Sequence, residues 1–233
     1  MKKYELTEET INVFGKTLHR IRATRDFSNV HAGDLGGFIE NELNLSHDRD
    51  TWVYGNAWAY GEARVYGNAL VSGEARVYGN ALVSGDARVY GNALVSGDAR
   101  VEGKALVGGD ALVYGKALVS GNAWAYGEAQ VYGNALVGGD ARVSGKARVY
   151  GEARVKGPRD IYWISCIGSR DGTTTFFRNA NNGISVSCGC FYGTIDEFAA
   201  AVTKTHGDNE HAQAYRHAIE IAKLRIKLED AES

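Results

Sequence analysis

Glycine recurs at every sixth position from Gly55 to Gly157, and this strict period constrains the fold more than any other feature of the sequence. Alanine recurs with the same period from Ala57 to Ala153, and valine, or twice alanine, follows two residues after each alanine. The Ala-x-Val alternation places two small apolar side chains on one face of a short strand. The Gly-Asn, Gly-Asp, Gly-Glu or Gly-Lys pair that follows suits a tight turn.

A strand this short cannot bury its own apolar face, so neighbouring hexads must cover one another. Three strands per turn, stacked as parallel coils, close a triangular tube with alanine and valine inside. We therefore predict a mainly β protein whose central part, residues 31–157, is a left-handed parallel β-helix built of hexapeptide repeats. A meander of hairpins would instead need polar, variable turns at intervals of about eight to twelve residues.

The open edges of a stack of coils need caps. Residues 1–30 are predicted to form an N-terminal β cap, and residues 33–39 and 43–45 read as degenerate first hexads. The spacing between the last of these and Val53 exceeds one hexad by two residues. Residues 46–50, which include His47, should therefore bulge from the first coil.

The six-residue period ends at Pro158, and residues 158–233 are predicted to form a small α+β module. It should contain three strands and two helices. Thr194-Ile-Asp-Glu197 has the pattern of a capping box and predicts the start of the first helix. Gly207 should end that helix, and Asp208 or Asn209 should cap the second. The predicted strands cover residues 161–167, 173–178 and 184–188.

Composition limits the class of protein. The net charge of -2 gives no indication of nucleic-acid binding, and no apolar run is long enough to predict a membrane span. No apolar stretch follows the lysines near the N-terminus, so we expect no secretory signal. The chain has three cysteines, an odd number that favours reduced thiols. We therefore expect a cytoplasmic location, inside a bacterial host.

Residues three hexads apart should stack in columns on the outside of the coil. One column carries tyrosines after the inward valine, with Trp58, Leu94 and Leu112 among the side chains beside it. We interpret this face as a subunit or partner interface, because so many outward apolar side chains suit a contact surface. The alternative is that stacked side chains only stabilise neighbouring coils. The predicted interface residues are Trp58, Tyr60, Tyr78, Leu94, Leu112, Tyr114, Tyr132 and Tyr150.

The hexad, from Val53-Tyr-Gly-Asn-Ala57 onward, resembles that of the hexapeptide acyltransferases. The resemblance implies a homo-oligomer, most often a trimer, and in the enzymes an acyl-coenzyme A site between subunits with a histidine as general base. No histidine lies between His47 and His206, and the eighteen regular hexads contain no extruded loop. We therefore expect no catalytic residue, with His47 as the candidate base and acyl-coenzyme A as the cofactor of an alternative transferase function.

The C-terminal module holds a second group of candidate residues. Arg170, Arg178 and His206 are the side chains that we expect to contribute to binding there. Cysteine and histidine side chains could also form a tetrahedral zinc site, although the Cys-x-Cys spacing is a weak signal and strand cysteines are more often buried apolar residues. We predict no metal. The residues of the zinc alternative are Cys166, Cys188, Cys190, His206 and His211.

A wider resemblance covers most of the chain. The segments His19–Ala23, Ala32–Ile39, Ser187–Phe191 and Thr205–Asp208 look like those of proteins encoded in bacteriophages and prophages, which are often labelled transferases from the repeat alone. The resemblance implies an origin rather than an activity. We hypothesise a non-catalytic binding protein that counters host defence, either by masking a host protein or by sequestering a small nucleotide signal.

Overall fold

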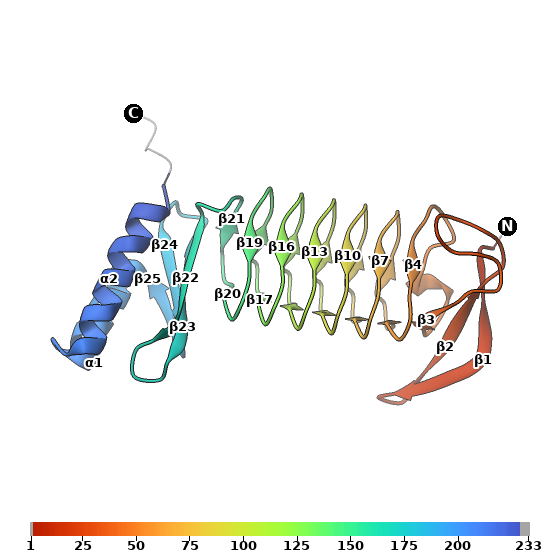
Figure 1. The fold of residues 1–233 in the computed structure, drawn as a ribbon, viewed down its shortest axis with the longest axis horizontal. Helices are drawn as coiled ribbons and strands as arrows, with labels where there is room; N and C mark the ends of the chain where they lie inside the picture. Colours follow the sequence, from red (N-terminus) through yellow and green to blue (C-terminus); the bar gives the residue numbers. More distant parts are fainter. Residues whose placement is uncertain (1, 229–233) are drawn as a thin grey trace.

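The computed structural model describes residues 2–228, which form an elongated molecule of three parts (Figure 1). A β hairpin and a short connecting segment lie at the N-terminal end, a coil of stacked strands follows, and a sheet with two helices closes the C-terminal end. The predicted mainly β fold with a parallel β-solenoid at its centre is confirmed. Among the described residues, no helix has the length and apolar character that crossing a membrane requires.

The coil consists of eighteen two-residue strands that belong to three sheets. Each strand pairs in parallel with the strand three hexads away, as Arg88 does with Leu70 on one side and Leu106 on the other. Three hexads therefore make one coil, as the sequence predicts, while the left-handed sense of winding stays a prediction. The strands are β4 (Trp52–Val53), β5 (Trp58–Ala59), β6 (Arg64–Val65), β7 (Leu70–Val71), β8 (Arg76–Val77), β9 (Leu82–Val83), β10 (Arg88–Val89), β11 (Leu94–Val95), β12 (Arg100–Val101), β13 (Leu106–Val107), β14 (Leu112–Val113), β15 (Leu118–Val119), β16 (Trp124–Ala125), β17 (Gln130–Val131), β18 (Leu136–Val137), β19 (Arg142–Val143), β20 (Arg148–Val149) and β21 (Arg154–Val155).

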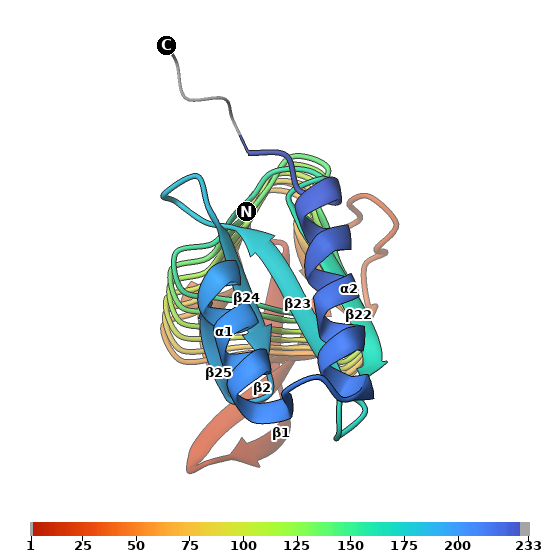
Figure 2. The ribbon, with the colours of Figure 1, turned by 90° about the vertical axis from the view of Figure 1, so that its left-hand side faces the viewer.

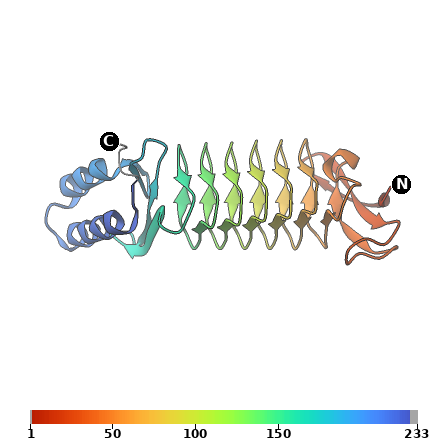
Figure 3. The ribbon, with the colours of Figure 1, turned by 90° about the horizontal axis from the view of Figure 1, so that it is seen from above.

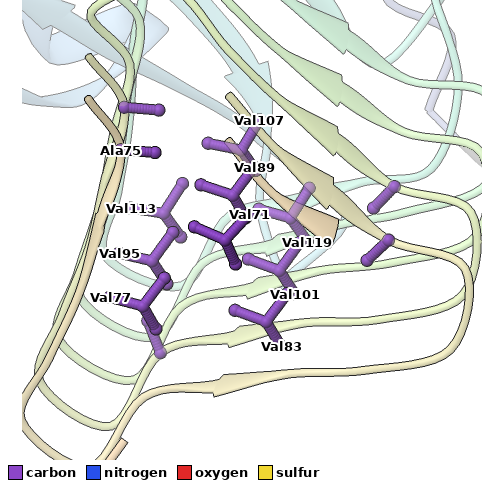
Figure 4. Close-up of a cluster of buried hydrophobic side chains, with 14 of the residues drawn as sticks. Val71, Ala75, Val77, Val83, Val89, Val95, Val101, Val107, Val113 and Val119 are labelled. Carbon is purple, nitrogen blue, oxygen red and sulfur yellow. The ribbon is translucent and has the colours of Figure 1, made fainter. Parts of the chain in front are cut away.

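Between Val71 and Val155, the repeat positions that fill the core of the coil are only alanine and valine. The repeat alanines and valines from Val71 to Val155 are fully buried. The valines of successive coils stack in columns, and their side chains point into the interior (Figure 4). The turns need glycine for a second reason besides backbone conformation. Gly85, for example, has φ +70°, and a Cβ atom added to it would lie 2.8 Å from the carbonyl oxygen of Gly103 in the next coil. The glycines therefore allow the coils to approach one another.

The outer side chains follow a second period. Over much of the coil the residue after each glycine alternates between Asn and an acid, and the outward strand residue alternates between Leu and Arg. Because a coil holds three hexads, an alternation of two places unlike residues above one another. Asn thus donates to the acid one coil away at 2.7–3.0 Å, and Arg lies beside Leu. The pairs are Asn56–Glu74, Asn68–Asp86, Asn80–Asp98, Asn92–Asp110, Asn122–Asp140 and Asn134–Glu152.

The N-terminal residues extend one sheet of the coil. β1 (Tyr4–Val13) and β2 (Lys16–Ala23) form an antiparallel hairpin, and β3 (Leu35–Ile39) joins β2 to β5. The short 3-10 helix η1 (Glu42–Asn44) follows, and Leu45 then pairs with Val65. Residues 33–45 thus begin the coil, as predicted. The paired residues of this first coil are farther apart in sequence than three hexads, and the difference accommodates the extra length of the loop at residues 46–50.

Lys3 closes the N-terminal end of the coil. Its side chain is fully buried, and its ammonium group donates to the Thr51 carbonyl at 2.6 Å and lies 4.9 Å from the centre of the Phe27 ring. Burial, and to a smaller degree the charge of Arg25, lower the pKa of Lys3 to about 8. This cap therefore contains a buried basic side chain. No described residue of the regular coil is a buried Lys or Arg.

The C-terminal sheet lies across the other end of the coil, with the helices on its far face (Figures 2 and 3). Successive residues of one strand point to opposite faces of this sheet. Phe177 packs with the core of the coil, whereas Phe176 packs under the helices. The hydroxyl of Thr175 also accepts the backbone N–H of Arg148 in the last coil. The elements are β22 (Ile161–Ile167), β23 (Gly172–Arg178), β24 (Ile184–Cys188), β25 (Phe191–Thr194), α1 (Ile195–His206) and α2 (Glu210–Arg225).

The sheet of the module has four strands where the sequence predicts three. β25 escapes prediction because it is short, contains Gly193 and runs directly into α1. The turn before it is tight, and its Gly189 has φ +59°. Both predicted helix starts are confirmed, with Thr194 and Glu197 forming the capping box of α1 and Asn209 capping α2.

Candidate functional site: a pocket in the C-terminal module

The predicted tyrosine face is a column of stacked rings that Ser96 interrupts between Tyr78 and Tyr114. The ring centroids of Tyr60 and Tyr78 are 5.2 Å apart, those of Tyr114 and Tyr132 are 4.7 Å apart, and those of Tyr132 and Tyr150 are 4.5 Å apart. The rings are within about 11° of parallel, so each covers much of the face of the next. The stacked rings therefore stabilise the contact between neighbouring coils, whether or not this face also binds a partner.

The chain itself covers both ends of this column. Tyr60 is buried against Val13, Leu18 and Phe38 of the N-terminal strands. At the other end, Tyr150 contacts Tyr192 with ring centroids 4.5 Å apart. Trp58 is covered by the guanidinium of Arg76 at 4.4 Å. In the middle of the column, Leu94, Leu112, Tyr114 and Tyr132 are partly exposed.

A neighbouring face is more exposed than the predicted one. Tyr90, Trp124 and Tyr126 each leave about two fifths of their surface open, and Arg142 stacks on Trp124 at 4.6 Å. Tyr90 is accommodated at the position of Gly108, where a Cβ atom would lie 2.1 Å from its ring. The sequence places these residues on one face of the coil but does not show that the chain leaves them uncovered.

His47, the candidate base of the transferase alternative, is held by the N-terminal cap. Its ring stacks on Tyr4 with centroids 4.2 Å apart, and Nδ1 accepts the backbone N–H of Lys3 at 3.3 Å. Its Nε2 atom is buried and lies 3.6 Å from a carboxylate oxygen of Glu42. A general base needs a nitrogen within reach of the substrate, and here the ring instead fixes the loop against the cap.

The cysteines and histidines of the zinc alternative are divided between different sites. Cys188, Cys190 and His206 line one pocket, whereas Cys166 and His211 lie outside it. Cys166, which lies on a predicted strand, is exposed, contrary to the expectation that strand cysteines are buried, and Cys190 in the turn is exposed as well. Within residues 2–228, no group of three or more His, Cys, Asp or Glu side chains could hold a metal ion.

Arg178 has a structural position at the base of the module. Its guanidinium lies 3.8 Å from the carboxylate of Asp160, and its backbone N–H donates to the Asp160 carbonyl. The same carboxylate accepts the backbone N–H groups of Lys156 and Gly157. Arg178 thus belongs to the junction between the last coil and the sheet, away from Arg170 and His206, which line the pocket.

The pocket lies between the helices and one end of the sheet and has a volume of about 220 Å³. The turn between β22 and β23 and the turn between β24 and β25 form one side, while α1 and Tyr215 of α2 form the other. Its walls are mainly apolar. They comprise Ile167, Gly172, Gly189, Phe191, Phe198, Ala201 and Val202, with the polar residues Ser169, Arg170, Cys188, Cys190, Thr205, His206 and Tyr215.

A small hydrogen-bond network borders the pocket. The Thr174 hydroxyl lies 3.1 Å from the Cys188 Sγ atom, which in turn lies 3.5 Å from the Tyr215 hydroxyl. Burial raises the pKa of Tyr215 well above its usual range, and the neighbouring Cys188 adds to this rise while Arg170 opposes it. Tyr215 is therefore a neutral hydroxyl at physiological pH.

Only part of this pocket could be found from the sequence. Arg170 and His206 are predicted binding residues and both line it, whereas Tyr215 is predicted only as a residue of the buried helix stripe. The contact of Tyr215 with Cys188 joins residues 27 positions apart in sequence, and nothing in the local pattern of either one indicates it.

Comparison with known proteins supports the coil. A family model described as the YdcK beta solenoid repeat matches residues 63–74, 75–91, 87–103 and 129–145, all within the coil. This part of the chain is therefore similar to the YdcK repeat, and the chain is a β-solenoid repeat protein. No curated protein matches the chain.

Proposed function

We propose that this chain is a non-catalytic binding protein, in which the coil is a rigid rod and the C-terminal module is the recognition element. The observation that carries the proposal is the apolar pocket of the module, which combines ring-sized space with Arg170, His206 and Tyr215. Pockets with apolar walls and a few polar groups are the usual form of ligand sites.

The resemblance to phage and prophage proteins supplies the setting of this proposal. A phage-encoded binding protein in a bacterial cytoplasm would counter host defence, by masking a host protein or by sequestering a small nucleotide signal. The pocket could receive a side chain of the first or part of the second. The transferase alternative has less support, because His47 is engaged by the cap.

The proposal includes self-assembly, for which the homotrimer of hexapeptide-repeat proteins is the expected form. The surface that remains for it on the tyrosine face is the central part around Leu94, Leu112, Tyr114 and Tyr132. Aromatic and leucine side chains of this kind are common at the centres of subunit interfaces.

Native mass spectrometry on protein purified from a bacterial host tests these statements together. We expect an oligomer that carries a co-purified molecule or protein. Ala201→Trp should fill the pocket and abolish this retention, because Ala201 lines it. Ala200→Trp is the matched control, since Ala200 is the exposed neighbour on α1 and its replacement should leave retention unchanged.

Two results would contradict the proposal. The first is a coenzyme A adduct together with acyl transfer that is lost in His47→Ala, which would make the chain an enzyme. The second is retention that is identical in Ala201→Trp and in the unaltered chain. Thermal unfolding of both tryptophan variants should be compared, so that a loss of retention is not confused with a loss of folding.

A further inference from the structure

The apolar part of the pocket has the size of one ring. Ile167, Phe191, Phe198 and Val202 surround it, and Phe198 also contacts Phe191 with ring centroids 5.1 Å apart. The volume of about 220 Å³ exceeds the roughly 150 Å³ in which an apolar cavity can hold a benzene ring. A single aromatic ring or a compact aliphatic group therefore fits, with space for one polar substituent.

The polar part of the pocket is cationic. Arg170 lies across the turn at Gly189, where its guanidinium comes within 4.0 Å of the position of an added Cβ atom. No described residue lining the pocket is Asp or Glu, and no ion pair of Arg170 is found within residues 2–228. Asp171, the next residue along the turn, does not line this pocket and instead lines a neighbouring hollow together with Lys146 and Arg148. Arg170 is thus available to an anion from outside.

The remaining titratable groups that face the pocket do not oppose an anion. An imidazole such as that of His206 cannot carry a negative charge, and Tyr215 keeps its proton because burial raises its pKa. Cys188 lies within hydrogen-bond distance of the hydroxyls of Thr174 and Tyr215. The pocket therefore combines an apolar end with a cationic end and contains no fixed negative charge.

We infer that this pocket binds a small organic anion, in which a ring-sized apolar group lies against Phe191 and Phe198 and a carboxylate or phosphate pairs with Arg170. The inference rests on the proposed function, since it names the ligand class of the same pocket. A guanidinium recognises both anions through paired N–H donors, so carboxylate and phosphate are two sources of one chemistry.

The cysteines provide an internal readout. Cys188 and Cys190 line the pocket, while Cys166 is exposed outside it. Alkylation by iodoacetamide, followed peptide by peptide by mass spectrometry, should therefore be slowed at Cys188 and Cys190 by a bound ligand and unchanged at Cys166. The probes are 3-phenylpropionate and phenyl phosphate, with 3-phenylpropan-1-ol lacking the charge and propionate lacking the ring.

We expect at least a tenfold slowing at the two pocket cysteines with one or both aromatic anions, and none with the alcohol or propionate. Arg170→Gln should raise the concentration needed for protection by about tenfold or more, as expected for loss of a charge-assisted hydrogen bond. Arg159→Gln, which alters an exposed arginine of the same module outside the pocket, should have no effect. Protection by phenyl phosphate but not phenylpropionate would assign the anion as phosphate, and the reverse would assign it as carboxylate.

Three results would overturn the inference. These are equal protection by the alcohol, protection that extends to Cys166, and no protection by either aromatic anion. If no probe protects but Ala201→Trp still loses the co-purified partner, the ligand class is wrong and the proposed function stands. If no probe protects and Ala201→Trp retains the partner, both are wrong.

Discussion

The coil and the two ends of the molecule solve the problem of burial in different ways. In the coil every layer is nearly the same, so alanine and valine fill the core and outward Asn side chains bond to an acid one coil away. The C-terminal module packs larger rings at varied angles, as Phe198 does against Phe176, Phe191 and Tyr215. Its packing leaves a pocket, and polar groups lie inside it.

This difference explains where recognition can arise. A repeating wall offers a ligand the same surface at every level and cannot by itself define one place. The ends break the repeat, and there the chain brings together a buried charge, as at Lys3, and a mixed polar and apolar pocket, as around Arg170. In the proposed function, the coil therefore sets the distance between the two ends of the molecule, and the ends select what is bound.

The largest test of this comparison places a charge in the core of the coil. Val101→Asp would bury a carboxylate between Val83 and Val119, where the described core offers it only aliphatic neighbours. We expect a loss of more than about 5 kcal/mol, enough to prevent folding of the coil. Circular dichroism and solubility would show this. Arg100→Gln, next to it but outward, should change stability by less than about 1 kcal/mol.

A second test asks whether the module can be loosened without the coil. Phe198→Ala removes a buried ring from the core of the module and should cost about 3–5 kcal/mol. Hydrogen exchange followed by mass spectrometry should then accelerate in α1 and α2 but not between residues 64 and 137. Faster exchange throughout the coil would show that the two parts unfold as one unit. Phe14→Ala is the control, because Phe14 is 90% exposed.

A smaller effect is expected from one turn of the coil. Gly85→Ala puts a Cβ atom on a residue with φ +70° and 2.8 Å from the carbonyl oxygen of Gly103, and should cost about 1–2 kcal/mol. Gly157→Ala should cost less, because its backbone is not left-handed and nothing lies within 4 Å of the added atom. Urea unfolding of the two variants compares them. Equal losses would mean that the close approach between coils is not the cause.

An effect of similar size concerns pH and should come from an end of the molecule. The pKa of Lys3 falls to about 8 in the folded chain because of burial and Arg25, from 10.5 in the unfolded chain. Between these values the unfolded chain binds more protons, so stability should rise with pH from 8 to 10, by at most about 1.4 kcal/mol per pH unit. Urea unfolding at several pH values measures this slope, and Lys3→Met should reduce it. A slope that is unchanged in the variant would assign the effect to another group.

Much of the fold is predictable because its signals are local or strictly periodic. The glycine period specifies the three-hexad register of the coil, and the capping box at Thr194 specifies the start of α1. β25 has no such signal, because a very short segment with a glycine inside it reads equally well as a loop. The two faces of the C-terminal sheet are also invisible in its sequence, since both Phe176 and Phe177 are apolar.

The candidate site is less predictable, since it depends on contacts between distant segments. Arg170 and His206 stand out as polar residues near turns, but their shared pocket results from the way α1 and α2 lie on the sheet. For the tyrosine column, the spacing of the residues predicts that the rings stack, but it does not predict which rings the rest of the chain buries. Only the folded chain shows that the N-terminal strands bury Tyr60 while Tyr90 and Trp124 stay open.

The alternation of two hexad types in coils of three also constrains how a gene for such a rod could lengthen. A duplication of two hexads would preserve the alternation but add two thirds of a coil, and so turn the C-terminal module by a third of a revolution relative to the N-terminal hairpin. A duplication of three hexads, the register of the coil, would preserve that orientation but place Asn above Asn and acid above acid. Both are preserved together only by six hexads, the smallest common multiple of the two periods. Gene duplications that keep both features should therefore lengthen the coil in steps of two turns, and each step adds about 10 Å.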